Sequence, residues 1–466
     1  MRPLRVALAA ACLSLACAAC ARGTPKTPAT DALAAQLPIG TRVATLKNGL
    51  KVVLQEDRRA PRIALRLTYR VGSSADPPGR SGFAHLFEHL MFEGTKHVPR
   101  GAFETTLRKI GARYNAATSP DETTYYETFP KHELEAVLWL ESERMGFFLE
   151  RLDQAMLDAA REVVKNELRQ RRDGVPYSAV SDAIFASVFP PDHPYHRPVG
   201  GTAAELDAAT LDDVRSFFLR WYAPNDATLV LIGDFDAGAA LERVRHWFEA
   251  IPAGPPPPQI PRLPPPVLAK DHRVLMEAGV TLPRLSLAWP IPAYGEPDDV
   301  ALASAATLLY WRVGGALTKE KELAHSVNVT RVPGRFGGLL VLSALLDERA
   351  NPEQALKVID DAMDDLSRFA RWTMDDKEVK SSLYQLYAEE VFSLDGATAR
   401  AEAFGTFDLL MNDPAGVVPR LRAYEALDSS DVVDAYRRWI LRPPRLTVIV
   451  RPKQGAPVSG RVMEES

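Results

Sequence analysis

The alternation of hydrophobic and polar positions predicts a chain of two similar halves. Strand-like runs occupy residues 51–55 and 63–69 in the first half and residues 272–276 and 285–289 in the second. Helix-like stretches follow these opening strands in both halves. This order of elements favours an α+β architecture in each half.

An internal repeat links the ends of the two halves. Near each end an amphipathic helix, a proline turn and a buried strand follow one another. Asp213 and Asp431 are 218 residues apart, and so are Trp221 and Trp439. A constant offset between matching residues indicates two copies of one domain.

The stretch between the copies is dense in proline and cannot continue a helix or a central strand. We expect a semi-rigid linker over residues 253–270, between a first domain over residues 41–252 and a second domain over residues 271–455. Residues 456–466 are expected to form a tail.

The N-terminal stretch, residues 1–20, has the form of an export signal. Arg2 and Arg5 precede an uncharged segment rich in Ala, Leu and Cys. All three cysteines of the chain lie in this segment, and the small-small-Cys sequence that ends at Cys20 is similar to the end of a bacterial lipobox. Cys17 departs from that pattern, because leucine is usual at its position.

These features predict a signal peptide over residues 1–20, lipidation of Cys20, a tether over residues 21–40, and a periplasmic protein anchored to the outer membrane. The alternative is an ordinary secretory signal that releases a soluble periplasmic protein. We expect no later segment to be long and apolar enough to span a bilayer, so membrane contact is expected only through the lipid.

Composition narrows the class of protein. The 466 residues are 46% hydrophobic and 25% charged, as in ordinary globular proteins, and this length suggests two domains or more. The formal net charge is −4, so the chain has no overall basic field and nucleic-acid binding is not expected.

Residues 85–89 spell His-Leu-Phe-Glu-His. On a helix, His85 and His89 lie on one face a single turn apart, with Glu88 beside them, which is the spacing of a zinc site. The alternative is a pair of ordinary helical histidines, so the zinc hypothesis needs a third ligand. The second half has no such motif after its opening strands, and the metal is therefore expected only in the first half.

A later helix-like segment offers the third ligand. Glu162 and Glu167 are five residues apart and cannot face the same way on a helix. Glu167 shares its face with Ala160, Val163 and Val164, and a carboxylate on an inward apolar face must be paired or bound to metal. We therefore prefer Glu167 and expect Glu162 to be solvated.

The motifs together resemble the pitrilysin and insulinase family of inverted-motif zinc peptidases, in particular its short two-domain branch that includes mitochondrial processing peptidase. Besides the His-x-x-Glu-His motif, the matching blocks are Gly94-Thr95, Asn-Ala-Ala-Thr-Ser-Pro-Asp over residues 115–121, and Arg-Glu-Val-Val-Lys-Asn-Glu over residues 161–167. The resemblance covers residues 41–450. It implies two homologous α+β domains, each a mostly antiparallel sheet with helices packed on one side.

The resemblance assigns one Zn²⁺ per chain to His85, His89 and Glu167, and the role of general base to Glu88. It implies a zinc-dependent endopeptidase that hydrolyses peptides or small unfolded proteins.

The resemblance also assigns a role to the block over residues 115–121. It places Asn115 and Ala116 at a strand edge that pairs with the backbone of a peptide substrate. An ordinary turn between strands is the alternative there.

One position departs from the family pattern. Relatives usually carry another glutamate seven residues before the ligand glutamate, where this chain has Ala160. Glu162 or another acid is a candidate to compensate. Loss of such a supporting group weakens a metal site, so the alternative function is a non-catalytic or weakly active member that binds peptides or scaffolds an active partner.

The second domain of such enzymes, or a partner chain, supplies an Arg and a Tyr that hold the substrate carbonyl. The candidates are Tyr384, Tyr387, Arg400 and Arg437, each of which is equally compatible with a packing or surface role. The lack of a clear motif predicts that a homologous partner chain, or a second copy in a homodimer, completes the site.

Overall fold

The computed structural model describes residues 40–256, 264–372 and 376–465. The predicted signal peptide with Cys20, almost all of the tether and the centre of the proline-rich linker lie outside the described residues. Residues 40–465 belong to one compact unit.

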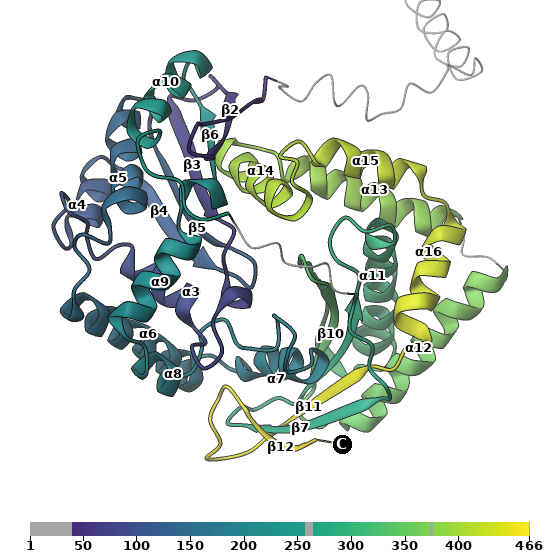
Figure 1. The fold of residues 1–466 in the computed structure, drawn as a ribbon. Helices are drawn as coiled ribbons and strands as arrows, with labels where there is room; N and C mark the ends of the chain where they lie inside the picture. Colours follow the sequence, from purple (N-terminus) through teal and green to yellow (C-terminus); the bar gives the residue numbers. More distant parts are fainter. Residues whose placement is uncertain (1–39, 257–263, 373–375, 466) are drawn as a thin grey trace, which may run out of the picture. The chain divides into compact units, whose positions relative to one another are not determined.

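Two six-stranded sheets form the framework, and five strands of each have the same order (Figure 1). The order is β1-β2-β6-β3-β5-β4 in the first sheet and β12-β7-β11-β8-β10-β9 in the second. In each sheet one pair is parallel, β2 with β6 and β7 with β11, and every other pair is antiparallel. The predicted class of two homologous α+β domains with mostly antiparallel sheets is confirmed.

The strands of the first sheet are β1 (Arg42–Thr45), β2 (Lys51–Glu56), β3 (Arg62–Tyr69), β4 (Arg113–Thr118), β5 (Thr123–Pro130) and β6 (Ala227–Gly233). Those of the second are β7 (His272–Ala278), β8 (Arg284–Ile291), β9 (Ala324–Val332), β10 (Gly338–Leu346), β11 (Leu446–Pro452) and β12 (Arg461–Glu465). All four strand-like runs of the sequence are strands here. The predicted tail, residues 456–466, contains β12. Its residues form a strand because they pair with the outer edge of β7.

Helices complete each half. The first half has α3 (Phe83–Leu90), α4 (Ala102–Lys109), α5 (Leu134–Phe147), α6 (Gln154–Gly174), α7 (Ala179–Val188), α8 (Ala203–Asp207), α9 (Leu211–Trp221) and α10 (Ala237–Phe248). The second has α11 (Asp299–Gly314), α12 (Pro352–Trp372), α13 (Asp376–Phe392), α14 (Ala397–Met411), α15 (Val417–Ala426) and α16 (Ser429–Tyr436).

The sequence repeat has a local physical cause at α9 and α16. Both helices begin with a capping box, in which an N-cap side chain and an aspartate three residues later each accept a hydrogen bond from the other's backbone N–H. The boxes are Thr210 with Asp213 and Asp428 with Asp431. The repeated aspartates therefore mark the same helix start in both halves.

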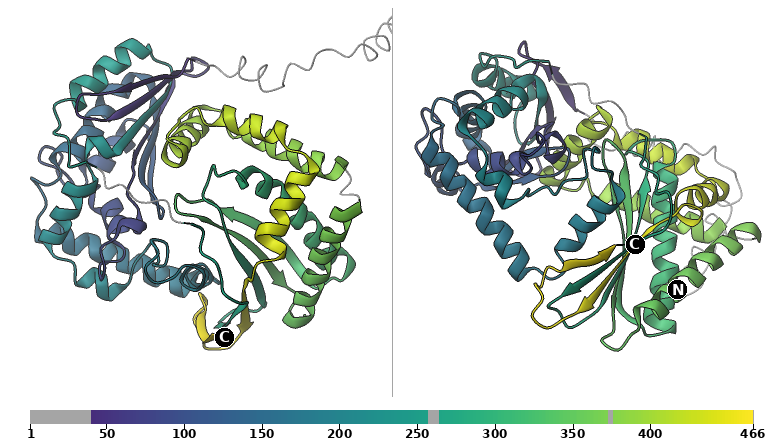
Figure 2. Two further views of the ribbon diagram at one scale, coloured as in Figure 1. Left: turned by 45° about the vertical axis from the view of Figure 1, so that its right-hand side comes forward. Right: turned by 60° about the horizontal axis from the view of Figure 1, so that its bottom comes forward.

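The halves exchange one helix each. α7 of the first half packs on the second sheet, and α14 of the second half packs on β3 and β6 of the first sheet (Figure 2). The two helices start at Ala179 and Ala397, again 218 residues apart. The side chains agree, because Val180 and Ile184 share a core cluster with the second sheet and Ala401 shares one with β2, β3 and β6. The helices are thus not confined to one side of either sheet.

One helical stretch, Asp299–Glu320, is long and apolar enough to cross a membrane, contrary to the expectation from sequence. In the structure 67% of its apolar window is buried, and α11 packs against β9, α12, α13 and α16. Its hydrophobicity is explained by its place in the core of the second half.

A buried carboxylate joins α14 to the first sheet. Asp408 accepts hydrogen bonds from Lys51 Nζ at 2.7 Å, Arg70 Nη2 at 2.7 Å and Thr228 Oγ1 at 2.6 Å, and its side chain is 1% exposed. Burial raises the pKa of Asp408, but the hydrogen bonds and the cationic neighbours outweigh burial, so its pKa lies below the ordinary value.

We predict that Asp408→Asn lowers the free energy of unfolding by about 3 kcal/mol, because it leaves two partly buried cations without their buried counter-ion. The exposed Asp395 is the matched control, and Asp395→Asn should change stability by less than about 0.5 kcal/mol. Urea unfolding measures both variants. The folded-state pKa of Asp408 is depressed, so its carboxylate stabilises the fold at pH values above the unfolded-state pKa of 3.8. This contribution is lost as the pH falls through the lower, folded-state pKa. The stabilities of the original protein and of Asp408→Asn should therefore converge in acid.

Candidate metal centre

The helix that carries the histidine motif is fixed at its N-terminus by a buried carboxylate. Asp76 accepts hydrogen bonds from the backbone N–H of Gly82 at 2.6 Å and of Ala84 at 2.9 Å. Gly82 has a φ of 88°, and a Cβ there would lie 2.7 Å from the carbonyl oxygen of Gly200, so only glycine fits. Burial raises the pKa of Asp76 to about 7.

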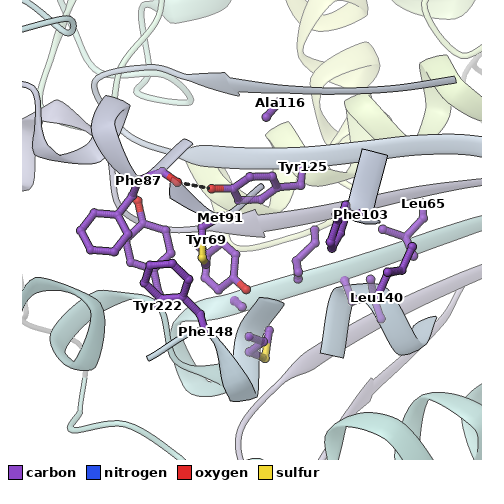
Figure 3. Packing of buried hydrophobic residues seen from close by; sticks show 14 of the residues in the cluster. Leu65, Tyr69, Phe87, Met91, Phe103, Ala116, Tyr125, Leu140, Phe148 and Tyr222 are labelled. Carbon is purple, nitrogen blue, oxygen red and sulfur yellow. Dashed lines mark hydrogen bonds between the residues drawn. The ribbon is translucent and has the colours of Figure 1, made fainter. Parts of the chain in front are cut away.

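The face of α3 that points away from its histidines packs in an aromatic core. The Phe87 ring stacks on Tyr222 at a centroid distance of 4.7 Å, and the Tyr125 hydroxyl donates to the Phe87 carbonyl oxygen at 3.1 Å (Figure 3). The apolar side chains of α3 are buried and its two histidines are partly exposed. The amphipathic pattern of α3 therefore turns His85 and His89 away from the core.

Three potential ligand atoms converge at this surface. The Nε2 atoms of His85 and His89 are 3.4 Å apart, and Glu167 Oε2 of α6 lies 3.6 Å from the first and 3.3 Å from the second. Ligands arranged tetrahedrally around Zn²⁺, at bond lengths of about 2.0–2.1 Å, are about 3.3–3.4 Å apart. The three side chains fit a zinc ion without rearrangement of the backbone.

The protonation states favour the same arrangement. Burial lowers the pKa of His85, which favours the neutral imidazole that binds metal. The hydrogen-bonding contact with His89 lowers the pKa of Glu167, which favours its carboxylate form. The site therefore offers two nitrogen donors and one anionic oxygen.

Glu88 stands beside these ligands and is held by β4. A carboxylate oxygen of Glu88 and one ring nitrogen of each histidine all lie within 4.8 Å of one another. The Thr118 hydroxyl donates to Glu88 Oε2 at 2.6 Å. This bond orients the carboxylate and leaves Oε1 available to another partner.

The turn that follows Thr118 is tied to the second half of the chain. Asp121 Oδ2 accepts hydrogen bonds from the Tyr195 hydroxyl at 2.6 Å and from the Arg335 backbone N–H at 3.0 Å. Asp121 is 6% exposed, and its burial raises its pKa. The conformation of the β4–β5 turn thus depends on contacts from distant parts of the chain.

β4 forms an edge of the first sheet, because among the described strands it pairs only with β5. Asn115 and Ala116 lie on this edge strand, and Thr118, which holds Glu88, ends it. They therefore belong to a strand and not to a turn. Their predicted contact with a substrate backbone remains a prediction.

Glu167 does not lie on the inward apolar face that the sequence predicted. The Glu167 side chain is 52% exposed and Val163 is 46% exposed, so the predicted inward face of α6 is limited to Ala160 and Val164. The carboxylate reaches the histidines because α6 packs against α3. Glu162 points outward as expected.

The contacts of Glu162 also remove it as a substitute for the missing glutamate. It pairs with Lys165 at 2.9 Å, and Ala160, which occupies the family's glutamate position, is completely buried in the core. His85 Nδ1 is buried and has no hydrogen-bond partner among the described residues. The described part of the chain therefore does not compensate for Ala160.

The four candidate donors of the second half occupy other roles or surfaces. Arg400 donates to Gln55 at 2.8 Å and pairs with Asp57, which fixes α14 to the first half. Arg437 pairs with Asp434 at 3.6 Å, and Tyr384 is 72% exposed. Burial raises the pKa of the fourth candidate, Tyr387. Arg400 has the packing role that the sequence left open as its alternative.

Three residues of the site were missed as functional positions in the sequence. Asp76 caps α3, Thr118 orients Glu88, and Asp121 fixes the turn between β4 and β5. The block over residues 115–121 signalled the last two, but their partners lie far away in the chain. No local pattern marked Asp76.

Comparisons with known proteins agree with the fold and the motif. The family model described as insulinase, peptidase family M16, matches residues 51–190, and the model described as peptidase M16 inactive domain matches residues 208–386. The zinc protease PqqE of Helicobacter pylori is 26% identical over 420 residues, which cover 88% of this chain and 92% of that protein.

Two further matches also span most of the chain. Mitochondrial-processing peptidase subunit beta of Saccharomyces cerevisiae is 24% identical over 391 residues, which cover 80% of this chain and 82% of that subunit. The crystal structure of a protease from Helicobacter pylori matches with a TM-score of 0.79 at 26% identity, covering 88% of this chain and 99% of the other.

We predict that Glu167→Gln weakens zinc binding by more than the roughly 10–100-fold effect of losing an outer contact, because it removes an anionic ligand. Glu162→Gln, on the same helix, should bind zinc like the original protein. Competition against a zinc indicator measures both. Unchanged affinity in Glu167→Gln, or equal losses in the two variants, would contradict the assignment.

Proposed function

Because this chain belongs to the M16 insulinase family of peptidases, we propose that it is a zinc-dependent endopeptidase that cuts peptides or small unfolded proteins. One Zn²⁺ per chain is held by His85, His89 and Glu167, and Glu88 is the general base. Members of the family that match this chain are named zinc proteases, which supports zinc as the metal.

One observation carries the proposal. Three ligand atoms from two helices meet at separations of 3.3–3.6 Å, and an oriented carboxylate stands beside them. Peptide binding alone requires neither a metal nor a base. A metal site with a carboxylate base beside it is the arrangement that metal-assisted hydrolysis requires.

The residues divide the chemistry between them. Zinc bound here supplies Lewis acidity, which polarises the scissile carbonyl and lowers the pKa of water to about 7. Glu88 accepts the proton of the attacking water and returns it to the nitrogen of the leaving amine. Thr118 keeps Glu88 in the orientation for both transfers.

The free edge of β4 supports recognition through the substrate backbone. An extended peptide that adds to β4 as another strand would pass beside Glu88, because Thr118 at the end of this strand bonds to Glu88. Main-chain pairing discriminates weakly between sequences. This favours extended or unfolded substrates, with Asn115 and Ala116 among the residues that face them.

A second candidate function rests on Ala160. Within the part of the chain that the structure describes, Nδ1 of His85 lacks the outer hydrogen bond that orients most zinc-ligating histidines. A weakly active chain that binds peptides, or that supports an active homologous partner, would account for this loss. The similarity to a subunit of mitochondrial-processing peptidase favours assembly with such a partner or with a second copy.

The N-terminal sequence supports export. We propose a periplasmic location with a lipid on Cys20 that anchors the protein to the outer membrane.

We predict that Glu88→Gln lowers kcat/KM for a quenched peptide substrate by about 100–10,000-fold, because the general base is lost while the ligands remain. Zinc content should not change, and a chelator should abolish cleavage by the original protein. Glu104→Gln, a partly exposed glutamate of α4, is the control and should retain activity. Equal cleavage by Glu88→Gln would exclude the proposed base.

The same assay, repeated with protein co-purified from its native host, tests the partner. Full activity of the isolated chain would contradict a requirement for another subunit.

Mass spectrometry of the mature N-terminus tests the anchor. We expect a chain that begins at Cys20 and carries the mass of attached acyl groups. An unmodified N-terminus would leave export intact and would overturn the lipid anchor.

A further inference from the structure

The second half contains a cavity at the position that the metal centre has in the first. The offset of 218 residues, which separates Asp213 from Asp431, also pairs each residue of the proposed zinc site with a residue of the second half. The pairs are His85 with Ala303, Glu88 with Ala306, His89 with Thr307, and Glu167 with Gln385.

All four second-half residues line one cavity of about 390 Å³. Ala303, Ala306 and Thr307 come from α11, and Gln385 comes from α13. β9 also contributes, and it has the same edge position in the second sheet that β4 has in the first. The second half therefore has a cavity at the equivalent place and none of the four zinc-site residues.

Two guanidinium groups supply positive charge to this cavity. Arg331 and Arg420 both line the cavity and both pair with the buried carboxylate of Asp299, Arg420 at 2.5 Å. Arg420 also donates to Glu390 at 2.5 Å and to the Tyr424 hydroxyl at 3.1 Å. Asp299 thus pairs with two cations, and Arg420 has two further partners, Glu390 and Tyr424.

Arg331 has fewer described partners than Arg420. Its Nε atom is buried and has no hydrogen-bond partner among the described residues, and its only described ion pair is with Asp299. Burial and the nearby charge of Arg420 lower the pKa of Arg331 to about 10. An anionic group that entered the cavity would relieve both costs.

The other walls carry groups suited to a peptide. Asn328 and Gln385 supply side-chain amides, and Glu389, which accepts from Gln385 at 2.8 Å, supplies a carboxylate for an ammonium group. The partly exposed ring of Tyr310 adds an apolar surface. A volume of about 390 Å³ lies in the range of sites for small ligands.

We propose that this cavity binds the C-terminal end of a short peptide, with the α-carboxylate on Arg331 and the backbone amides on Asn328 and Gln385. The site is separate from the zinc centre and uses no metal. Its occupation does not depend on the proposed peptidase activity, so either proposal can fail without the other.

The test uses the full chain in the Glu88→Gln background with chelator present, so that no peptide is cut. Calorimetric titration compares trialanine with trialanine amide. We expect saturable binding of the acid, and binding of the amide at least about 10-fold weaker, the loss expected for a charge-assisted hydrogen bond. Equal affinities would overturn the proposal, and so would an absence of saturable binding.

Two neighbouring substitutions on α13 locate the site. Gln385→Glu places a carboxylate against the ligand and should weaken binding about 10-fold or more, whereas Tyr384→Ala, outside the cavity lining, should leave affinity unchanged. Thermal unfolding of both variants verifies that they fold. Equal affinity of the two variants would place the peptide elsewhere, and stronger binding of inorganic phosphate than of trialanine would make this a general anion site. Either result contradicts the proposal.

Discussion

The packing of α3 on the first sheet is the constraint on which the candidate centre depends. Phe87 presses into an aromatic cluster and its carbonyl oxygen receives the Tyr125 hydroxyl, while Asp76 holds the start of the helix. Because these three contacts hold α3, the helix has little freedom to rotate about its axis. His85 and His89 consequently point in one direction, and α6 contributes a single ligand oxygen, Oε2 of Glu167.

That second helix delivers its carboxylate without a buried support. Ala160 and Val164 pack inward, and Glu167 reaches the histidines from a half-exposed position. A buried glutamate at position 160 would need a partner in an apolar core, and alanine avoids that desolvation cost. Nδ1 of His85 has no hydrogen-bond acceptor among the described residues.

The two halves show how one fold can hold different chemistry at equivalent places. The sheets share the order of five strands, and the capping boxes at Asp213 and Asp431 start equivalent helices. The reciprocal exchange of α7 and α14 joins each sheet to the other half of the chain. Yet the site of the second half contains two alanines, a threonine and a glutamine where the first has histidines and glutamates. Backbone architecture depends on hydrophobic periodicity and caps, which tolerate such replacements at the surface of a cavity.

By itself the sequence determined the features that are local or periodic. The opening strands, the two-domain α+β class and the repeat were predictable, because alternation, capping and offset are all written within single segments. The spacing of His85 and His89 indicated a common helix face for the same reason. Helical phase favoured Glu167 as the third ligand on the premise of an inward apolar face, which the structure contradicts, although its carboxylate does lie beside the histidines. Only the tertiary structure decided that α6 meets α3, that Thr118 holds Glu88, and that residues 461–465 form a strand instead of a tail. These contacts join residues far apart in the chain, and their formation depends on how whole elements pack, which no local pattern specifies.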